Sequence, residues 1–140
     1  MKIKFFEGKD GLMDEDAVKP GVYIVKIAKA SDPNDSIPLY IGESYSMAQR
    51  CGRHLYETLE VDPQYFGLTR EILETPELML LFEVLDCVKK SKNLKSKLKT
   101  IEKARIKKIE PISQYNTCDR VLPNRTDFVD KKIKAFLSAK

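Results

Sequence analysis

Residues 21–42 read GVYIVKIAKASDPNDSIPLYIG, and this stretch decides the fold. Residues 21–29 are rich in β-branched and aromatic side chains, which is typical of a strand. A cluster of turn-forming residues follows at 31–36. Residues 38–42 then read as a second short strand. The stretch therefore predicts an antiparallel hairpin whose strands are joined by a long loop.

The residues around this hairpin predict further strands and helices. Residues 2–6 are expected to form a short edge strand, and residues 46–60 a helix that Asp62 and Pro63 end. A shorter helix is expected over 69–74. Residues 78–87, LMLLFEVLDC, form an apolar run of strand length, which indicates a buried central strand. Periodicity alone leaves a helix open for this run.

Two amphipathic helices complete the prediction. Residues 91–109 predict a long basic helix that Pro111 ends, and residues 112–125 look irregular. Residues 127–139 predict a helix that either covers the core or forms a dimer contact. We expect an α+β fold with a small three-stranded antiparallel sheet, flanking helices and an extra C-terminal helix. The apolar residues are Leu94, Leu98, Ile101 and Ile109 in the first helix and Phe128, Ile133, Phe136 and Leu137 in the second.

Composition is that of one globular domain. The 140 residues are 42% hydrophobic and 33% charged, and no apolar run approaches the roughly 18 residues of a membrane helix. We expect a single domain over 1–140, with its core at about 20–117, no membrane contact and a cytoplasmic location. The three cysteines, Cys51, Cys87 and Cys118, are widely spaced and there is one histidine, which argues against a zinc site or a disulfide framework.

Positive charge is concentrated in one segment. The net charge is +4, but Lys89 to Lys108 holds ten lysines and arginines against the single acid Glu102. Such a segment suits a polyanion, because each neutralised phosphate releases condensed counterions. A solvated lysine-rich helix face is the alternative.

Five residues could together handle a phosphodiester. Tyr23 and Tyr40 would project from paired strands, and Arg50 and His54 share one helix face because they are four residues apart. Arginine offsets charge on a phosphate, a carboxylate such as Glu102 holds a hard divalent cation, and a phenol or imidazole can take a proton from water. Each residue taken singly also has a structural explanation, so the argument depends on their joint order.

That order resembles the GIY-YIG nuclease superfamily, which includes the catalytic domain of the excinuclease C protein, phage homing endonucleases and some restriction enzymes. The GVY and YIG motifs stand at 21–23 and 40–42. Family members usually carry an arginine ten residues beyond the YIG tyrosine and often a histidine four residues later. They then have a helical glutamate, an apolar residue, a proline and an asparagine. In this sequence the corresponding residues are Arg50, His54, Glu102, Ile106, Pro111 and Asn116.

The resemblance implies hydrolysis of DNA with one divalent cation, Mg²⁺ or another such as Mn²⁺. Glu102 would bind the metal, Arg50 would stabilise the transition state, and Tyr40 would orient water or phosphate. Tyr23 is the preferred general base, with His54 as the competitor or a phosphate ligand. Nucleic-acid contacts are expected from Arg53, Lys95, Lys99, Arg105 and Asn116.

Three features depart from the family pattern. The segment between Tyr23 and Tyr40 is longer than the usual hairpin, Asn116 lies further past Pro111, and Glu43 stands where some members have lysine. Two alternatives stay open: a GIY-YIG fold that binds nucleic acid without cleaving it, and an unrelated α+β interaction protein. A homodimer or a partner subunit also stays open.

Overall fold

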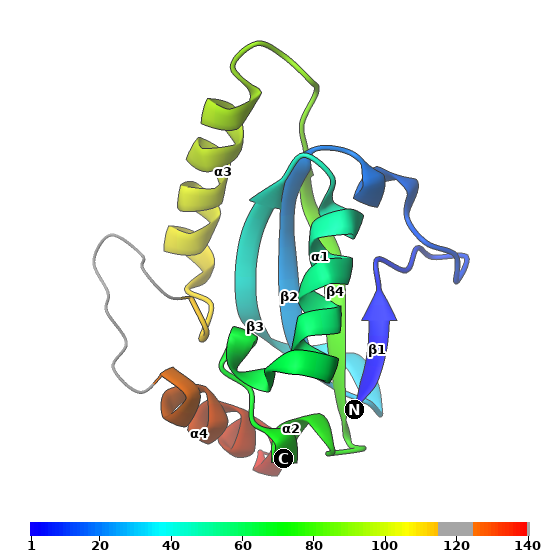
Figure 1. Ribbon diagram of the computed structural model, residues 1–140. Coiled ribbons are helices and arrows are strands. Elements are labelled where there is room, and N and C mark those ends of the chain that lie inside the picture. Colours follow the sequence, from blue (N-terminus) through cyan, green and yellow to red (C-terminus); the bar gives the residue numbers. More distant parts are fainter. Residues whose placement is uncertain (115–124, 140) are drawn as a thin grey trace.

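The computed structural model describes residues 1–114 and 125–139. An α+β fold is observed, as predicted, but the sheet has four strands instead of three, in the order β1-β4-β2-β3 (Figure 1). The strand expected over 2–6 pairs parallel to β4, whereas the other two pairings are antiparallel. The strands are β1 (Lys2–Phe5), β2 (Gly21–Lys29), β3 (Asp32–Ser44) and β4 (Leu78–Cys87).

The helices occupy the predicted regions with shifted bounds. The first α-helix ends at Tyr56 and continues as a π-helical turn over Glu57–Val61. Thr69 caps α2 by accepting a hydrogen bond from the Ile72 N–H. The helices are α1 (Met47–Tyr56), α2 (Arg70–Leu73), α3 (Leu94–Ile109) and α4 (Arg125–Ser138), with short 3-10 turns η1 (Glu15–Val18) and η3 (Pro63–Phe66).

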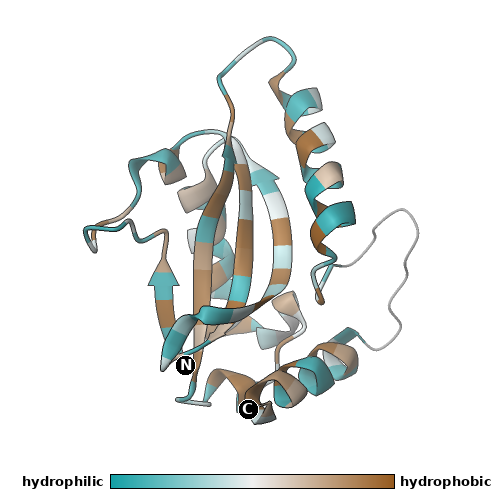
Figure 2. Cartoon of the chain, turned by 180° about the vertical axis from the view of Figure 1, so that it is seen from behind, coloured by the Kyte–Doolittle hydropathy of each residue, from teal (hydrophilic) through white to brown (hydrophobic). Residues whose placement is uncertain are grey.

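Strand β2 lies at the centre and is buried on both faces. On one face Tyr23, Val25 and Ile27 join the larger core, to which α1, α2 and α4 also contribute. Val22 and Ile24 point to the other face, where Ile101, Ile106 and Ile109 of α3 pack against them. Seen from behind, α3 runs alongside β3 (Figure 2). The sheet therefore separates α1 from α3, and β3 is the edge that lies between them.

The C-terminal helix covers the core in this structure. Val129 and Ile133 are fully buried, and the rings of Phe128 and Phe136 pack against the same cluster. This contact accounts for the apolar side of α4 without a second molecule. In the described ranges, no helix combines the length and apolar character that a membrane crossing requires.

The long hairpin loop predicted between the two motifs is wrong. Strand β3 begins at Asp32 and pairs with β2 from Lys29 onward, so the added residues lengthen the hairpin itself. The turn-forming residues at 31–36, which include Pro33, predicted a loop, whereas this proline lies within β3, as does Pro38. An edge strand tolerates them, since one row of its N–H groups faces away from the sheet.

A β-bulge in β3 determines where the second motif points. Val25 is opposite Tyr40 and Lys26 is opposite Pro38, so Leu39 is the extra residue. Leu39 and Tyr40 consequently both pack against the larger core although they are neighbours in the chain. Bulges often re-aim a side chain beside a functional site, and this one places the Tyr40 ring on the same face as Tyr23.

Candidate active site

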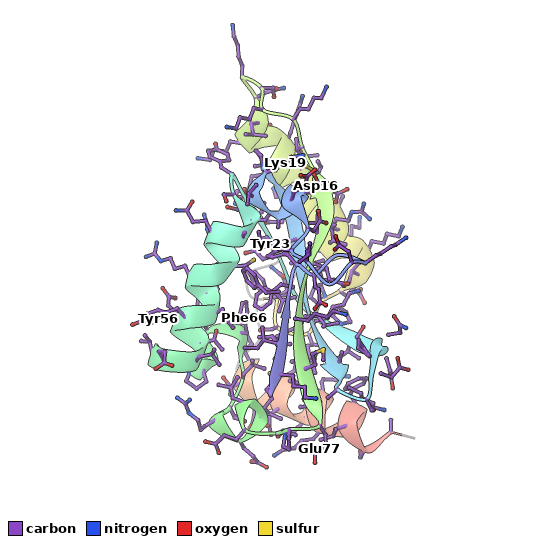
Figure 3. The ribbon with its side chains drawn as sticks, turned by 90° about the vertical axis from the view of Figure 1, so that its right-hand side faces the viewer. Asp16, Lys19, Tyr23, Tyr56, Phe66 and Glu77 are labelled. Atoms are coloured by element: carbon purple, nitrogen blue, oxygen red, sulfur yellow. The ribbon has the colours of Figure 1, made fainter. Side chains whose placement is uncertain are left out.

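Tyr23 lies beneath the glycine of the second motif. The two residues are cross-strand partners, and a Cβ placed on Gly42 would collide with the Tyr23 hydroxyl and come within 2.5 Å of its Cζ. The ring is only 1% exposed and sits between the sheet and α1 (Figure 3). Burial raises the pKa of Tyr23 well above its usual range, and a hydrogen bond links its side chain to Cys51.

Tyr40 is the more accessible of the two phenols. Its ring centroid is 6.5 Å from that of Tyr23, and its side chain is half-buried. Burial raises the pKa of Tyr40 to about 12. The charge of Glu102 also raises this pKa, whereas Arg50 lowers it. The phenol, the carboxylate and the guanidinium therefore lie close enough to influence one another, although they come from β3, α3 and α1.

Glu102 reaches the outer edge of β3 from α3, where the Glu43 backbone donates a hydrogen bond to its carboxylate. Because β3 is an edge strand, its outward N–H groups need partners from outside the sheet. Gln114 Oε1 accepts the hydrogen bond of Ile41 N–H at 3.0 Å. Burial raises the pKa of Glu102, and the neighbouring Glu43 carboxylate adds to the effect. Lys99, a backbone hydrogen bond from Glu43 and Arg50 act in the opposite direction.

Arg50 lies at the mouth of the site. It is exposed on the first turns of α1, and its charge lowers the pKa values of Tyr23, Tyr40 and Glu102. The guanidinium also lines a pocket of about 660 Å³ between the start of α1 and the start of α3. Arginine in such a position can reach a phosphate that lies over the β3 edge. The structure thus brings Tyr23, Tyr40, Arg50 and Glu102 to one place.

His54 lies deeper than a base that contacts substrate would. Its side chain is 7% exposed, its Nε2 is 3.0 Å from the Tyr65 hydroxyl, and the two rings stack. Nδ1 is buried without a hydrogen-bond partner among the described residues. Burial lowers the pKa of His54 to about 4, with a further contribution from Arg50. The imidazole is therefore neutral at pH 7. It contacts Tyr65 through the hydrogen bond and the ring stacking.

The residues predicted to contact nucleic acid lie in different surroundings: some line the pocket, and others pair with carboxylates. Arg53 and Lys95 are exposed and line the same pocket as Arg50. Lys99 forms an ion pair with Glu43 at 3.0 Å. Arg105 instead donates two hydrogen bonds of 2.9 Å to Asp86 and so ties α3 to β4.

Two donors of Arg105 are engaged by Asp86, and its expected contact with nucleic acid stays a prediction. Asn116 lies outside the described residues. The expected roles of Arg53, Lys95 and Lys99 stay predictions.

The chain is similar to a GIY-YIG endonuclease domain of known structure. That structure is the N-terminal endonuclease domain of UvrC from Thermotoga maritima, a point mutant bound to its catalytic divalent cation. The two chains are 24% identical, the match covers 71% of this chain and 87% of that one, and the TM-score is 0.41.

No protein-family model and no curated protein matches the sequence.

Two residues at the site carried no signal in the sequence. Tyr65 follows the Asp62-Pro63 break in an irregular segment, yet its phenol influences the pKa values of both Tyr23 and Tyr40. Tyr45 directly follows β3 and is 57% exposed. Neither residue belongs to a periodic pattern, so only the folded structure reveals that both lie beside Arg50.

Proposed function

We propose that this chain is a divalent-metal-dependent endonuclease that hydrolyses DNA phosphodiester bonds. The observation that carries the proposal is the meeting of Glu102, Arg50 and Tyr40 at the β3 edge. These residues come from three elements, and residues 40 and 102 are far apart in the chain. A carboxylate, a guanidinium and a phenol in one place provide metal binding, charge stabilisation and water positioning.

The carboxylates fit Mg²⁺ better than a metal that needs a full protein cage. Among residues 1–114 and 125–139 there is no group of three or more His, Cys, Asp or Glu side chains able to hold a metal. Mg²⁺ is commonly bound through one or two carboxylates, with water and substrate phosphate completing its shell. Glu102 would hold the cation. The Glu43 carboxylate lies near the Glu102 carboxylate and raises its pKa. The bound cation would supply Lewis-acid stabilisation of the phosphate and of the leaving 3′ oxygen.

Arg50 would contact the scissile phosphate and stabilise the charge that grows on it during attack. Its guanidinium is always protonated, and it can donate two parallel hydrogen bonds to phosphate oxygens. The side chain is exposed, so no rearrangement of the core is needed for this contact. Loss of a donor to a developing oxyanion costs about 10²–10³ in kcat in other hydrolases, and we expect a similar effect for Arg50→Ala.

Tyr40 would position the attacking water. The phenol is half-buried beside Glu102, whereas Tyr23 is covered by Gly42 and α1. A Tyr23 phenolate would be buried away from water, which makes this residue a costly general base. We therefore assign Tyr23 the task of holding Tyr40 and Gly42 in place, and His54 the task of orienting Tyr65.

The exposed lysines of α3 would bind the DNA backbone beyond the scissile phosphate. Lys95, Lys97, Lys103 and Lys107 are all exposed on this helix. Each phosphate contact contributes about one unit to the slope of log affinity against log salt concentration. Replacing all four lysines by glutamine should therefore flatten this slope, and an unchanged slope would assign this helix face to solvent.

Analysis of the ends formed on plasmid DNA tests the proposed function. Wild-type protein with Mg²⁺ should leave 3′-hydroxyl and 5′-phosphate ends, because the 3′ oxygen is the leaving group. EDTA and Glu102→Ala should each abolish the products, and Arg50→Ala should slow their formation about 10²–10³-fold, while circular dichroism shows an unchanged fold. A mobility shift without cleavage would support a binding module, and neither effect would support an interaction protein.

A further inference from the structure

A pocket beside the proposed active site is large enough for a small organic ligand. Its volume of about 660 Å³ falls within the roughly 300–1,000 Å³ typical of such sites. Arg50 belongs to this pocket and to the proposed catalytic group, so whatever fills the pocket lies next to the scissile phosphate. Its lining comes from the end of β3, the start of α1 and the start of α3: Glu43, Ser44, Tyr45, Ser46, Gln49, Arg50, Arg53 and Lys95.

The charges of the pocket favour an anion. Three cationic side chains, Arg50, Arg53 and Lys95, line the pocket together with a single carboxylate, Glu43. Arg53 also forms an ion pair of 3.5 Å with Glu57, but its side chain stays 78% exposed. Lys99 already offsets the Glu43 carboxylate through a 3.0 Å ion pair. A phosphate group next to the scissile one would therefore be attracted into the pocket.

Tyr45 gives the pocket an aromatic surface. The Tyr45 residue is 57% exposed and lines the pocket, so its ring is accessible to a ligand there. The residue joins β3 to α1, so the backbone on both sides of the ring is held by regular structure. Exposed aromatic rings set among cations are what proteins use to hold single-stranded nucleic acid, since every base has a face on which to stack.

We propose that this pocket holds one unpaired nucleotide adjacent to the cleaved bond, with its base stacked on Tyr45 and its phosphate held by Arg53 and Lys95. The inference rests on the proposed nuclease function and narrows its substrate class. A base inside a duplex is stacked on both faces and paired along its edge, so it is not free to stack on Tyr45. The preferred substrate is therefore DNA with an unpaired nucleotide at a branch, a gap or a single-stranded end.

A fluorescent base tests this proposal without requiring cleavage. A DNA flap carrying 2-aminopurine as its first unpaired nucleotide is titrated with protein in EDTA, because 2-aminopurine emission is quenched when the base stacks. Wild-type protein and Tyr45→Phe should both quench it, since phenylalanine keeps the stacking surface. Tyr45→Ala should lose the quenching and bind about 5- to 150-fold more weakly, the loss expected from one base–aromatic stack.

Tyr56→Ala is the matched control. Tyr56 is 62% exposed but lies on the outer side of α1 and does not line the pocket (Figure 3). This variant should quench and bind as the wild type does. Equal affinity of Tyr45→Ala and wild type, equal losses in both alanine variants, or no preference for the flap over an intact duplex would each overturn the pocket assignment.

The two proposals fail separately in this design. Quenching in EDTA reports stacking alone, whereas the end analysis with Mg²⁺ reports hydrolysis. Quenching that depends on Tyr45 in a protein that leaves no cut ends would remove the nuclease function and keep the nucleotide site. Cutting without any dependence on Tyr45 would remove the nucleotide site and keep the nuclease.

Discussion

Replacing Gly42 with alanine should damage both the fold and the proposed site. The added Cβ would collide with the Tyr23 hydroxyl and lie 2.5 Å from its Cζ, closer than real Cβ contacts come. The Tyr23 residue is 1% exposed, so its ring is enclosed by neighbouring groups. Overpacking of this kind costs about 1–3 kcal/mol in the free energy of unfolding.

Gly52→Ala provides the control within the same protein. Gly52 lies inside α1, and the nearest atom to a methyl group added there is Phe5 Cζ at 4.0 Å. Alanine is favoured over glycine in a helix by about 0.5–1 kcal/mol, so this variant should be more stable than wild type. Replacing glycine with alanine is thus expected to lower the free energy of unfolding at position 42 and to raise it at position 52.

Chemical denaturation followed by circular dichroism measures both effects, which suits a chain with no tryptophan. Tyr23→Phe removes one of the two colliding groups, so it should recover part of the loss in the Gly42→Ala background. The coupling between the two changes should be at least about 0.5 kcal/mol. A Gly42→Ala protein as stable as wild type, or additive effects in the double variant, would refute the packing of Tyr23 against Gly42.

Three further predictions concern titration and thiol reactivity. Because burial raises the pKa of Tyr40 to about 12, the free energy of unfolding should fall as pH rises from 10 to 12. This fall should be smaller in Tyr40→Phe. An equal dependence of the free energy of unfolding on pH in both proteins would contradict the burial of Tyr40. Because burial lowers the pKa of His54 to about 4, stability should fall as pH drops below 6.5, and urea titrations between pH 6.5 and 5 should show a weaker dependence in His54→Gln. Peptide mapping after brief alkylation should find exposed Cys87 modified and buried Cys51 protected in the folded protein. Equal labelling of the two thiols would contradict the burial of Cys51.

The elements of the fold were well predicted from the sequence because their patterns are local. The apolar run at 78–87 and the strand-like residues at 21–29 became β4 and β2. The hairpin loop was mispredicted because proline and asparagine normally signal a turn, whereas β3 holds them on an open edge. The parallel pairing of β1 with β4 depends on contacts between distant residues, which periodicity does not encode.

The sequence selected candidate site residues but did not indicate how deeply each side chain is buried. Motif spacing selected Tyr23, Tyr40, Arg50 and Glu102, and the structure brings these four together. Burial, however, depends on what covers each side chain. No local pattern indicates that Tyr23 lies beneath Gly42, or that His54 packs against Tyr65.

Arg105 illustrates the same limit. On a lysine-rich helix it looked like a residue for binding nucleic acid, but the fold places Asp86 opposite it. Whether a basic side chain faces solvent or an acid on a neighbouring strand is set by tertiary packing.

The most direct measurement is the single-turnover rate of plasmid nicking in Mg²⁺ for Glu102→Gln and Glu110→Gln. Both changes remove one carboxylate charge from the α3 segment, but Glu110 is the exposed C-cap of the helix. We predict that Glu102→Gln loses nicking to background while Glu110→Gln cuts at the wild-type rate. Nicking by Glu102→Gln at the rate of Glu110→Gln would contradict the proposed metal-binding site.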